Sequence, residues 1–344
     1  MNDYEVISKF NKKYNLVTRK IVRLLSENSR LSVAEISKRL NVSRPTVKDR
    51  ITRLEKEFGV KYTIEIDERA IGLNSPHIIA IKFKKKPNYE KIKTILTSSY
   101  IPQVAFSVSG DYDLVIYANA LSGSAYAHWD KAMRILLGEY GATWEPSEVI
   151  HRQLGFFPLR NEAINKTNLD ETSKALLTFL NNNARLSFQQ LSKMLKMHFN
   201  TVKYNYDKLV KAGYIKRATI TMDLIKSLCF MTFFTNYVPT HGYEQQSAKA
   251  REAVFSDDDN PLISRYPISA PLIGSHDLFA LSVFDDKAIA YKHDLSFHKS
   301  LFVNHGIKMV TGEIKYIILG RLPIRSLDTR KEFKKIVWTS ELEE

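Results

Sequence analysis

The stretch RLSVAEISKRLNVSRPTVKDRITRL, residues 30–54, decides the fold because the chain contains it twice. Residues 185–209 read RLSFQQLSKMLKMHFNTVKYNYDKL, and the two stretches share 10 identities over 25 positions at an offset of 155. Self-similarity at a fixed offset is the mark of repeated structural units. We therefore expect two copies of one small module.

Each copy has the pattern of three helices and a short pair of strands. In the first copy, Ser32 is an N-cap candidate with Glu35 at the capping-box spacing. Ser43 can cap a third helix, and Pro45 suits its first turn, where no backbone donor is lost. Residues 60–66 alternate as a strand of the wing. A short helix, a tight turn and a basic helix predict a winged helix-turn-helix, whose second helix enters the major groove of DNA.

The charge supports a nucleic-acid partner. The 344 residues carry a formal net charge of +14, of which residues 1–71 hold +6 and residues 160–226 hold +7. Lysine and arginine neutralise phosphates and supply most of the non-specific affinity for nucleic acid. We therefore expect double-stranded DNA to be bound by the two modules. A helix-turn-helix used only for protein contacts is the alternative.

The third helix of the first module carries the predicted DNA contacts. They are Ser43, Arg44, Thr46, Lys48, Arg50 and Arg53. Arg44 and Arg50 have the donor fork that recognises guanine, whereas Lys48 and Arg53 suit phosphates. We expect this module to read base sequence.

The second copy departs from the first on this helix. His198, Phe199 and Asn205 replace Ser43, Arg44 and Arg50, so Asn200 could cap a helix that begins later. The predicted contacts are Asn200, Thr201, Lys203, Tyr204 and Lys208. Lysine and tyrosine can hold phosphates, but bidentate arginine contacts are lost. The aromatic residues suit a packing surface equally well, and we expect affinity rather than sequence choice from this module.

The segments that follow the modules are also related. Gly110-Asp111-Tyr112-Asp113-Leu114 matches Gly274-Ser275-His276-Asp277-Leu278, and each stretch precedes an apolar strand. In the first segment, strands are expected at 77–83, 104–109, 114–118 and 147–154, with helices at 89–98 and 124–140. The order βαββαβ predicts a ferredoxin-like domain. The fold class is therefore α+β, with two winged helix-turn-helix modules alternating with two ferredoxin-like βαββαβ domains.

This order of modules resembles the Lrp/AsnC (feast/famine) transcription regulators. The resemblance is carried by Arg30-Leu31-Ser32, Ser43-Arg44-Pro45-Thr46-Val47 and Gly110-Asp111-Tyr112-Asp113-Leu114. It covers residues 16–159 well and 169–324 more weakly. Such regulators usually carry one module pair and dimerise, so this chain is similar to a fused dimer. The resemblance implies a sequence-specific regulator that forms a homo-oligomer, a dimer, through its sheets.

The resemblance also implies a small-molecule effector, such as an amino acid, near the Gly-x-x-Asp turns. The candidate effector-binding residues are Gly110, Asp113, Gly274 and Asp277. The alternative, which we favour, is that each aspartate stabilises its own turn through bonds to the backbone. His276 in place of Tyr112 weakens the transfer to the second half.

Two other functions stay open. Sirohaem decarboxylases have a similar architecture, although no block of His, Arg and Tyr here matches a tetrapyrrole site, and a chromatin-type protein would coat DNA without sequence choice. The nine histidines form no His-Glu-x-x-His pattern, and the single Cys229 suits a core strand. We expect no enzyme activity, catalytic residue, cofactor or metal.

The expected domain limits follow from the two repeats. They are a first winged helix-turn-helix at 1–71, a first βαββαβ domain at 72–159, a second winged helix-turn-helix at 160–226, a second βαββαβ domain at 227–324 and a tail at 325–344. A polar N-terminus, one cysteine and short apolar runs predict a cytoplasmic protein without a membrane segment.

Overall fold

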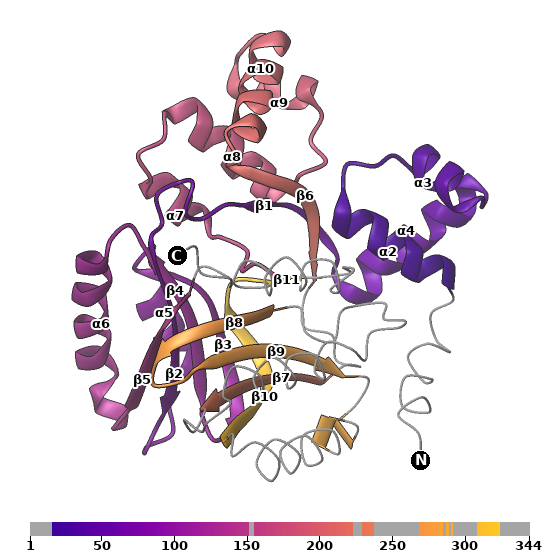
Figure 1. Cartoon of the computed structure of the whole chain (residues 1–344). Coiled ribbons are helices and arrows are strands. Elements are labelled where there is room, and N and C mark those ends of the chain that lie inside the picture. The colour runs from indigo at the N-terminus through magenta and orange to yellow at the C-terminus, as the bar shows by residue number, and fades with distance from the viewer. Residues whose placement is uncertain are drawn as a thin grey trace, which may run out of the picture.

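The structure is a computed structural model of the whole chain. It describes residues 16–150, 155–222, 229–236, 268–284, 287–288, 290–291 and 308–323. Figure 1 shows a barrel of strands with the two helical modules beside one end of it, the second module at the top and the first at the right. The expected tail at 325–344 and the acidic segment at 256–260 lie outside the described residues.

The first module consists of three helices and one strand. They are α2 (Leu16–Glu27), α3 (Val33–Leu40), α4 (Arg44–Phe58) and β1 (Lys61–Ile66). The predicted capping box of α3 is confirmed, because the Ser32 hydroxyl accepts from the Glu35 amide and the Glu35 carboxylate accepts from the Ser32 amide. The core is made of Ile21, Leu25, Ile36, Val47 and Leu54, each 3% exposed or less. The three helices predicted for this module are therefore confirmed.

The second module repeats this arrangement and adds one short helix. Its elements are α7 (Asn161–Lys166), α8 (Glu171–Asn182), α9 (Phe188–Leu195), α10 (Phe199–Lys211) and β6 (Ile215–Met222). Ser187 and Gln190 form a second capping box at the start of α9. Leu176, Leu180, Leu191, Val202 and Leu209 are 1% exposed or less and form the core.

The expected strand pair within each module is wrong. Each module has one strand after its last helix, and the two strands pair with each other: β1 runs antiparallel to β6, with Lys61 opposite Thr221. The short strand β11 (Leu322–Pro323) pairs with β6 and completes a three-stranded sheet. An isolated two-stranded hairpin has little stability of its own. The pairing of β1 with β6 and β11 instead places both module strands in one three-stranded sheet. It also joins the two modules.

Eight further strands form a closed barrel. They are β2 (Ser75–Lys82), β3 (Pro102–Gly110), β4 (Leu114–Ala120), β5 (Thr143–Val149), β7 (Cys229–Asn236), β8 (Ile268–Gly274), β9 (Leu278–Phe284) and β10 (Lys308–Leu319). The order around the barrel is β10-β3-β4-β2-β5-β8-β9-β7. Each half contributes four neighbouring antiparallel strands in the ferredoxin-like order, which confirms the predicted fold class.

The two half-sheets join edge to edge at two seams. Strand β3 pairs with β10 at one seam, and β5 pairs with β8 at the other. Closure pairs the strand edges, which would otherwise be open to association with other chains. The barrel interior is apolar, with Phe106, Phe234 and Phe279 each 1% exposed or less.

Two helices cover the outer face of the first half-sheet (Figure 1). They are α5 (Tyr89–Thr97) and α6 (Gly123–Leu137), followed by the 3₁₀ turn η2 (Gly138–Tyr140). Ile92, Leu96, Trp129 and Met133 bury their side chains against the sheet. In the second half, the described strands match the expected pattern, whereas most of the residues between them, including the stretch that carries His293, His298 and His305, lie outside the described residues. Cys229 opens β7 and is buried, as predicted.

Candidate nucleic-acid interface

Helix α4 begins where its capping chemistry predicts. Ser43 has an extended backbone, its hydroxyl accepts from the Thr46 amide at 3.2 Å, and Pro45 lies in the first turn. Four buried side chains, Val47, Ile51, Leu54 and Phe58, hold one face of the helix in the core. The opposite face is therefore fixed relative to the rest of the chain.

The structure exposes most of the predicted contacts of the first module. Ser43, Arg44, Lys48 and Arg53 are exposed, and Arg53 lies 3.4 Å from Glu57 in an exposed ion pair. Thr46 is half-buried, with its hydroxyl 2.8 Å from that of Ser43. Arg50 is also half-buried, and its Nε is buried without a hydrogen-bond partner in the described part of the chain. Arg44 is thus the better placed of the two arginines for a base edge.

Helix α10 begins two residues earlier than a cap at Asn200 would allow. The helix starts at Phe199, and His198 is the N-cap, with its Nδ1 accepting from the Asn200 amide at 3.3 Å. The proposed cap at Asn200 is therefore wrong. An imidazole nitrogen can fill the acceptor role that Ser43 fills in the first module.

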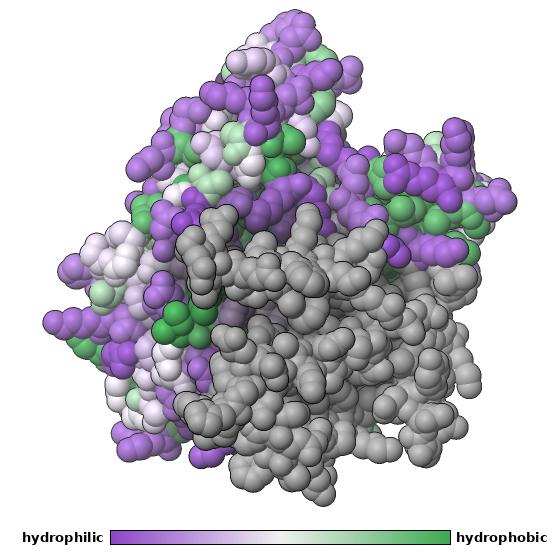
Figure 2. All heavy atoms as spheres, in the orientation of Figure 1, coloured by the Kyte–Doolittle hydropathy of each residue, from purple (hydrophilic) through white to green (hydrophobic). Residues whose placement is uncertain are grey.

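The surface of α10 mixes lysines with aromatic side chains. The predicted contacts Asn200, Thr201, Lys203, Tyr204 and Lys208 are all exposed. Tyr204 is 69% exposed, whereas Tyr206 is half-buried against Phe188, with the ring centroids 5.2 Å apart. Figure 2 shows that hydrophilic side chains predominate on the outer ends of both modules in that view. The two modules thus both present polar surface, but only the first presents an arginine at the helix start.

Reciprocal contacts fix the two modules to each other. The Ser29 amide donates to the Ala218 carbonyl at 2.9 Å, and the Ala184 amide donates to the Tyr62 carbonyl at 3.2 Å. Arg30 donates to the Ala184 carbonyl, and Arg185 donates to the Ser29 carbonyl. Each contact has a counterpart about 155 residues away, so the modules are related by an approximate two-fold axis.

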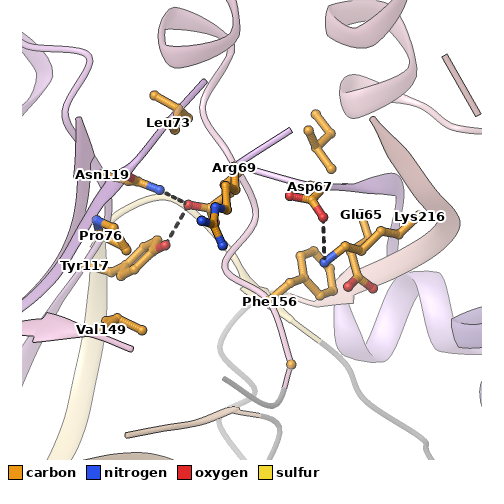
Figure 3. Close-up of a pocket in the computed structure, with 13 residues that line it drawn as sticks. Glu65, Asp67, Arg69, Leu73, Pro76, Tyr117, Asn119, Val149, Phe156 and Lys216 are labelled. Atoms are coloured by element: carbon orange, nitrogen blue, oxygen red, sulfur yellow. Dashed lines mark hydrogen bonds and ion pairs between the residues drawn. The ribbon is translucent and has the colours of Figure 1, made fainter. Parts of the chain in front are cut away.

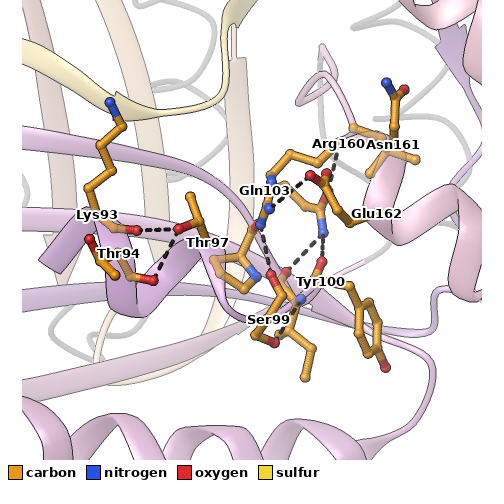
Figure 4. A network of polar contacts seen from close by, with 12 residues as sticks. Lys93, Thr94, Thr97, Ser99, Tyr100, Gln103, Arg160, Asn161 and Glu162 are labelled. Carbon is orange, nitrogen blue, oxygen red and sulfur yellow. Dashed lines mark hydrogen bonds and ion pairs between the residues drawn. The ribbon is translucent and has the colours of Figure 1, made fainter.

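A second set of contacts fixes the second module to the barrel (Figure 4). Arg160, just before α7, donates to the carbonyls of Ser99 at 2.8 Å and Pro102 at 3.0 Å. The Gln103 side chain accepts from the Arg160 amide and donates to the Tyr100 carbonyl. These bonds link the chain that enters the module to the start of β3.

The Gly-x-x-Asp turns lie at the two seams of the barrel. Gly110 has φ +147°, and a Cβ there would meet the carbonyl oxygen of Thr311 on β10. Gly274 has φ +140°, and a Cβ there would lie 2.8 Å from the carbonyl oxygen of Pro146 on β5. Both glycines therefore serve close approach between the half-sheets.

The aspartates of these turns are engaged within the protein. The Asp113 carboxylate accepts from the Phe83 amide at 2.8 Å and from Lys82 Nζ at 3.1 Å. The Asp277 amide donates to the Thr235 carbonyl at 2.9 Å. The Asp113 carboxylate thus binds groups at the end of β2 rather than the backbone of its own turn.

The structure brings together a buried polar cluster that the sequence analysis missed. Tyr112 and His276, which are equivalent in the repeat, lie 2.8 Å apart (Oη to Nε2), and Tyr112 also donates to Glu145. His276 Nδ1 lies 2.7 Å from Asn236 Oδ1. Burial lowers the pKa of His276, and the nearby Glu145 opposes that shift. The repeat offset aligns the first two residues, but nothing in the sequence links them to Glu145 or Asn236.

A cavity of about 260 Å³ lies where the joined sheet meets the barrel (Figure 3). Asp67 pairs with Lys216 at 3.2 Å on one wall. On another wall the Glu68 carboxylate accepts from the Tyr117 hydroxyl at 2.6 Å and from the Asn119 amide. Burial raises the pKa of Glu68 to about 7. No sequence motif marked this cavity.

Other kinds of site are absent from the described residues. Among them, no group of three or more His, Cys, Asp and Glu side chains is placed to hold a metal ion. None of the described helices combines the length and the apolar character needed to cross a membrane.

Comparison with known proteins identifies the modules. The family model described as winged helix-turn-helix DNA-binding matches residues 15–57 and again residues 169–216. An uncharacterized HTH-type transcriptional regulator of Pyrococcus furiosus is 37% identical over 102 residues, which are 29% of this chain and 68% of the relative. The HTH-type transcriptional regulator LrpC of Bacillus subtilis is 29% identical over 104 residues, which are 30% of this chain and 71% of LrpC.

A solved structure matches almost the whole chain. It is the siroheme decarboxylase NirDL, with a TM-score of 0.56 and 13% sequence identity, and the match covers 95% of this chain and 100% of the other. At this identity, the likeness shows that the two chains share a fold.

Proposed function

Because the chain belongs to the Lrp/AsnC family of helix-turn-helix transcription regulators, we propose that it recognises a specific DNA sequence chiefly through its first module. That the chain is a DNA-binding transcription regulator follows from the family. The proposal concerns how the two modules divide the work. The observation that carries it is the difference between the two helix starts, with exposed Arg44 in one module and Phe199 in the other.

The first module has the chemistry for reading bases. In this docking mode, the N-terminal residues of the second helix of the motif reach the base edges. Ser43, Arg44 and Lys48 lie there and are exposed. A bidentate arginine–guanine contact contributes about 1–3 kcal/mol of discrimination. Arg53 lies further along the helix, where a phosphate contact is the better fit.

The second module has the chemistry for holding the backbone. Lys203 and Lys208 are exposed and their positive charge suits phosphates, which carry no sequence information. Asn200, Thr201 and Tyr204 can add hydrogen bonds to phosphate oxygens. The fixed geometry between the modules would then set the spacing of the two contacts on one duplex.

Genome-wide mapping of the DNA bound by the full chain tests the function. A sequence-specific regulator gives discrete sites with a shared motif. A chromatin-type protein gives broad coverage without a motif, and this outcome would contradict the proposal.

A siroheme decarboxylase is a second candidate, favoured by the match to NirDL over nearly the full length of both chains. The basic surfaces of both modules favour DNA instead. The purified protein distinguishes the two candidates, because a tetrapyrrole enzyme incubated with iron-uroporphyrin would retain its visible absorbance after desalting. We expect no such retention.

The effector and the assembly belong to the same proposal. An amino acid effector acting through Asp113 would have to displace the bonds from Lys82 and Phe83. Such an effector should change the melting temperature of the wild type, and Asp113→Ala should lose that change.

Both seams of the barrel are closed within one chain. A homo-oligomer therefore needs a surface other than these strand edges, and we propose the outer faces of the barrel for that role.

A further inference from the structure

A second cavity lies between the two helix-turn-helix modules. It has a volume of about 280 Å³ and is lined by Arg30, Leu31, Ser32, Val33, Arg185 and Ser187. Four of these residues belong to the first module, and two, Arg185 and Ser187, belong to the second. The cavity therefore lies close to the approximate two-fold axis that relates the modules.

Two arginines, Arg30 and Arg185, line this cavity. Arg30 Nη1 donates to the Ala184 carbonyl at 2.6 Å, and Arg185 donates to the carbonyls of Ser29 at 2.7 Å and Leu31 at 3.3 Å. Among the described residues, neither guanidinium lies within ion-pair distance of an Asp or Glu side chain. Each guanidinium has five N–H donors, so donors remain on both.

Aromatic rings hold both guanidinium groups in place. Arg185 Cζ lies 4.0 Å from the centre of the Tyr62 ring. Arg30 Cζ lies 5.2 Å from the centre of the Phe188 ring and 5.6 Å from that of Tyr206. Cation–π contacts of this kind fix the orientation of an arginine without neutralising it. The two positive charges are thus both half-buried and preorganised.

The surroundings add positive potential. Both capped helices, α3 and α9, begin at the cavity, and the first-turn amides of a helix carry a partial positive charge. In the first module, the Glu35 carboxylate accepts from the Ser32 amide at 2.7 Å, and the Glu55 carboxylate accepts from the Tyr62 hydroxyl. The residue equivalent to Glu35 in the second module is the neutral Gln190. The residues that line the cavity carry two positive charges and no negative one.

We propose that this cavity binds a phosphate group between the two modules. Two like charges held close together in a partly buried interface disfavour that interface unless an anion compensates them. Guanidinium groups bind phosphate oxygens through two parallel N–H···O bonds. The group can come from a small phosphorylated molecule or from the backbone of bound DNA, and the chemistry of recognition is the same.

Thermal unfolding of the full chain in inorganic phosphate tests the site. Sodium phosphate should raise the melting temperature in a saturable way, relative to sodium chloride of equal ionic strength. Arg30→Gln and Arg185→Gln should each lose this rise. Arg23→Gln should keep it, because Arg23 is exposed on α2 and pairs with Glu27 rather than facing the cavity. A rise that is absent in the wild type, or unchanged in both cavity variants, overturns the proposal.

Conservative variants keep the test decisive if the glutamine variants do not fold. Arg30→Lys and Arg185→Lys retain the charge but lose the planar fork. The phosphate concentration that gives half of the rise in melting temperature should therefore increase by about tenfold. A midpoint equal to that of the wild type in both lysine variants would contradict a site built on guanidinium groups.

Titration with duplex DNA distinguishes the two sources of phosphate. If the cavity takes a DNA phosphate, inorganic phosphate competes with the duplex. Arg30→Gln then lowers the slope of log affinity against log salt concentration by about one. If it takes a small molecule, duplex affinity stays unchanged in Arg30→Gln while the thermal response to phosphate is lost. Each result supports the site and names its ligand source, independently of whether the DNA is read by sequence.

Discussion

At the scale of single residues, Gly110 shows how one position sets the barrel seam. Its φ of +147° is unfavourable for a side chain, and a Cβ would contact the backbone of Thr311 and Gly312 on β10. We expect Gly110→Ala to lower the free energy of unfolding by about 2–3 kcal/mol, measured by denaturant titration. The control is Gly123→Ala, because Gly123 lies in α6 with nothing near its Cβ position. A loss at Gly110 no larger than that at Gly123 would contradict this account of the seam.

Glu68 gives a prediction about pH. Its pKa is raised from the ordinary value of 4.5 to about 7, first by burial, against hydrogen bonds from Tyr117 and Asn119 that lower it. The folded chain therefore binds this proton more tightly than the unfolded chain. The resulting stability is complete below pH 4.5 and is lost as the pH rises through 7.

Glu68→Gln removes this titration while keeping an acceptor for Tyr117 and Asn119. Between pH 5 and pH 8, the wild type should therefore lose melting temperature relative to the variant. Glu148→Gln, at an exposed position on β5, is the control for the change in net charge. Parallel pH profiles for the wild type and Glu68→Gln would show that Glu68 does not titrate in this range.

At the scale of elements, the strand edges of the half-sheets explain the duplication. In the whole chain, β3 is paired with β10 and β5 with β8. A fragment of residues 72–159 would leave both of its edges open, and open edges of this kind pair with other chains. We expect the fragment to form dimers in light scattering, with a second copy taking the place of the missing half. A fragment that folds but stays monomeric at high concentration would contradict this explanation.

The elements also show what the sequence could and could not predict. The 3.6-residue periodicity, the capping box at Ser32 and the repeat offset were sufficient for the helices and for the α+β class. The partners of β1 and of the barrel edges were not predictable, because strand pairing between distant segments leaves no local pattern. Glu145, which joins Tyr112 and His276, was missed for the same reason. The cap at His198 was missed because its side chain is an unusual acceptor for that position.

At the scale of the whole molecule, one chain holds two similar modules in a fixed relation. Reciprocal bonds at Arg30 and Arg185, and the pairing of β1 with β6, connect the modules that carry α4 and α10. A homodimer would make both reading helices identical. The fused chain allows them to differ, and here Phe199 occupies the repeat position that is equivalent to Arg44. The central claim is that this difference divides base recognition from backbone binding.

The most direct test is a binding titration on a mapped site and on a scrambled duplex of the same length. Arg44→Ala and Arg50→Ala should reduce the preference for the mapped site, and the loss for a bidentate contact is about 1–3 kcal/mol. The larger loss should come at Arg44, which is exposed, whereas Arg50 is half-buried. Lys203→Ala should weaken both duplexes alike and lower the salt dependence by about one charge. If both arginine variants keep the full preference while Lys203→Ala abolishes it, the second module reads the sequence and the account is wrong.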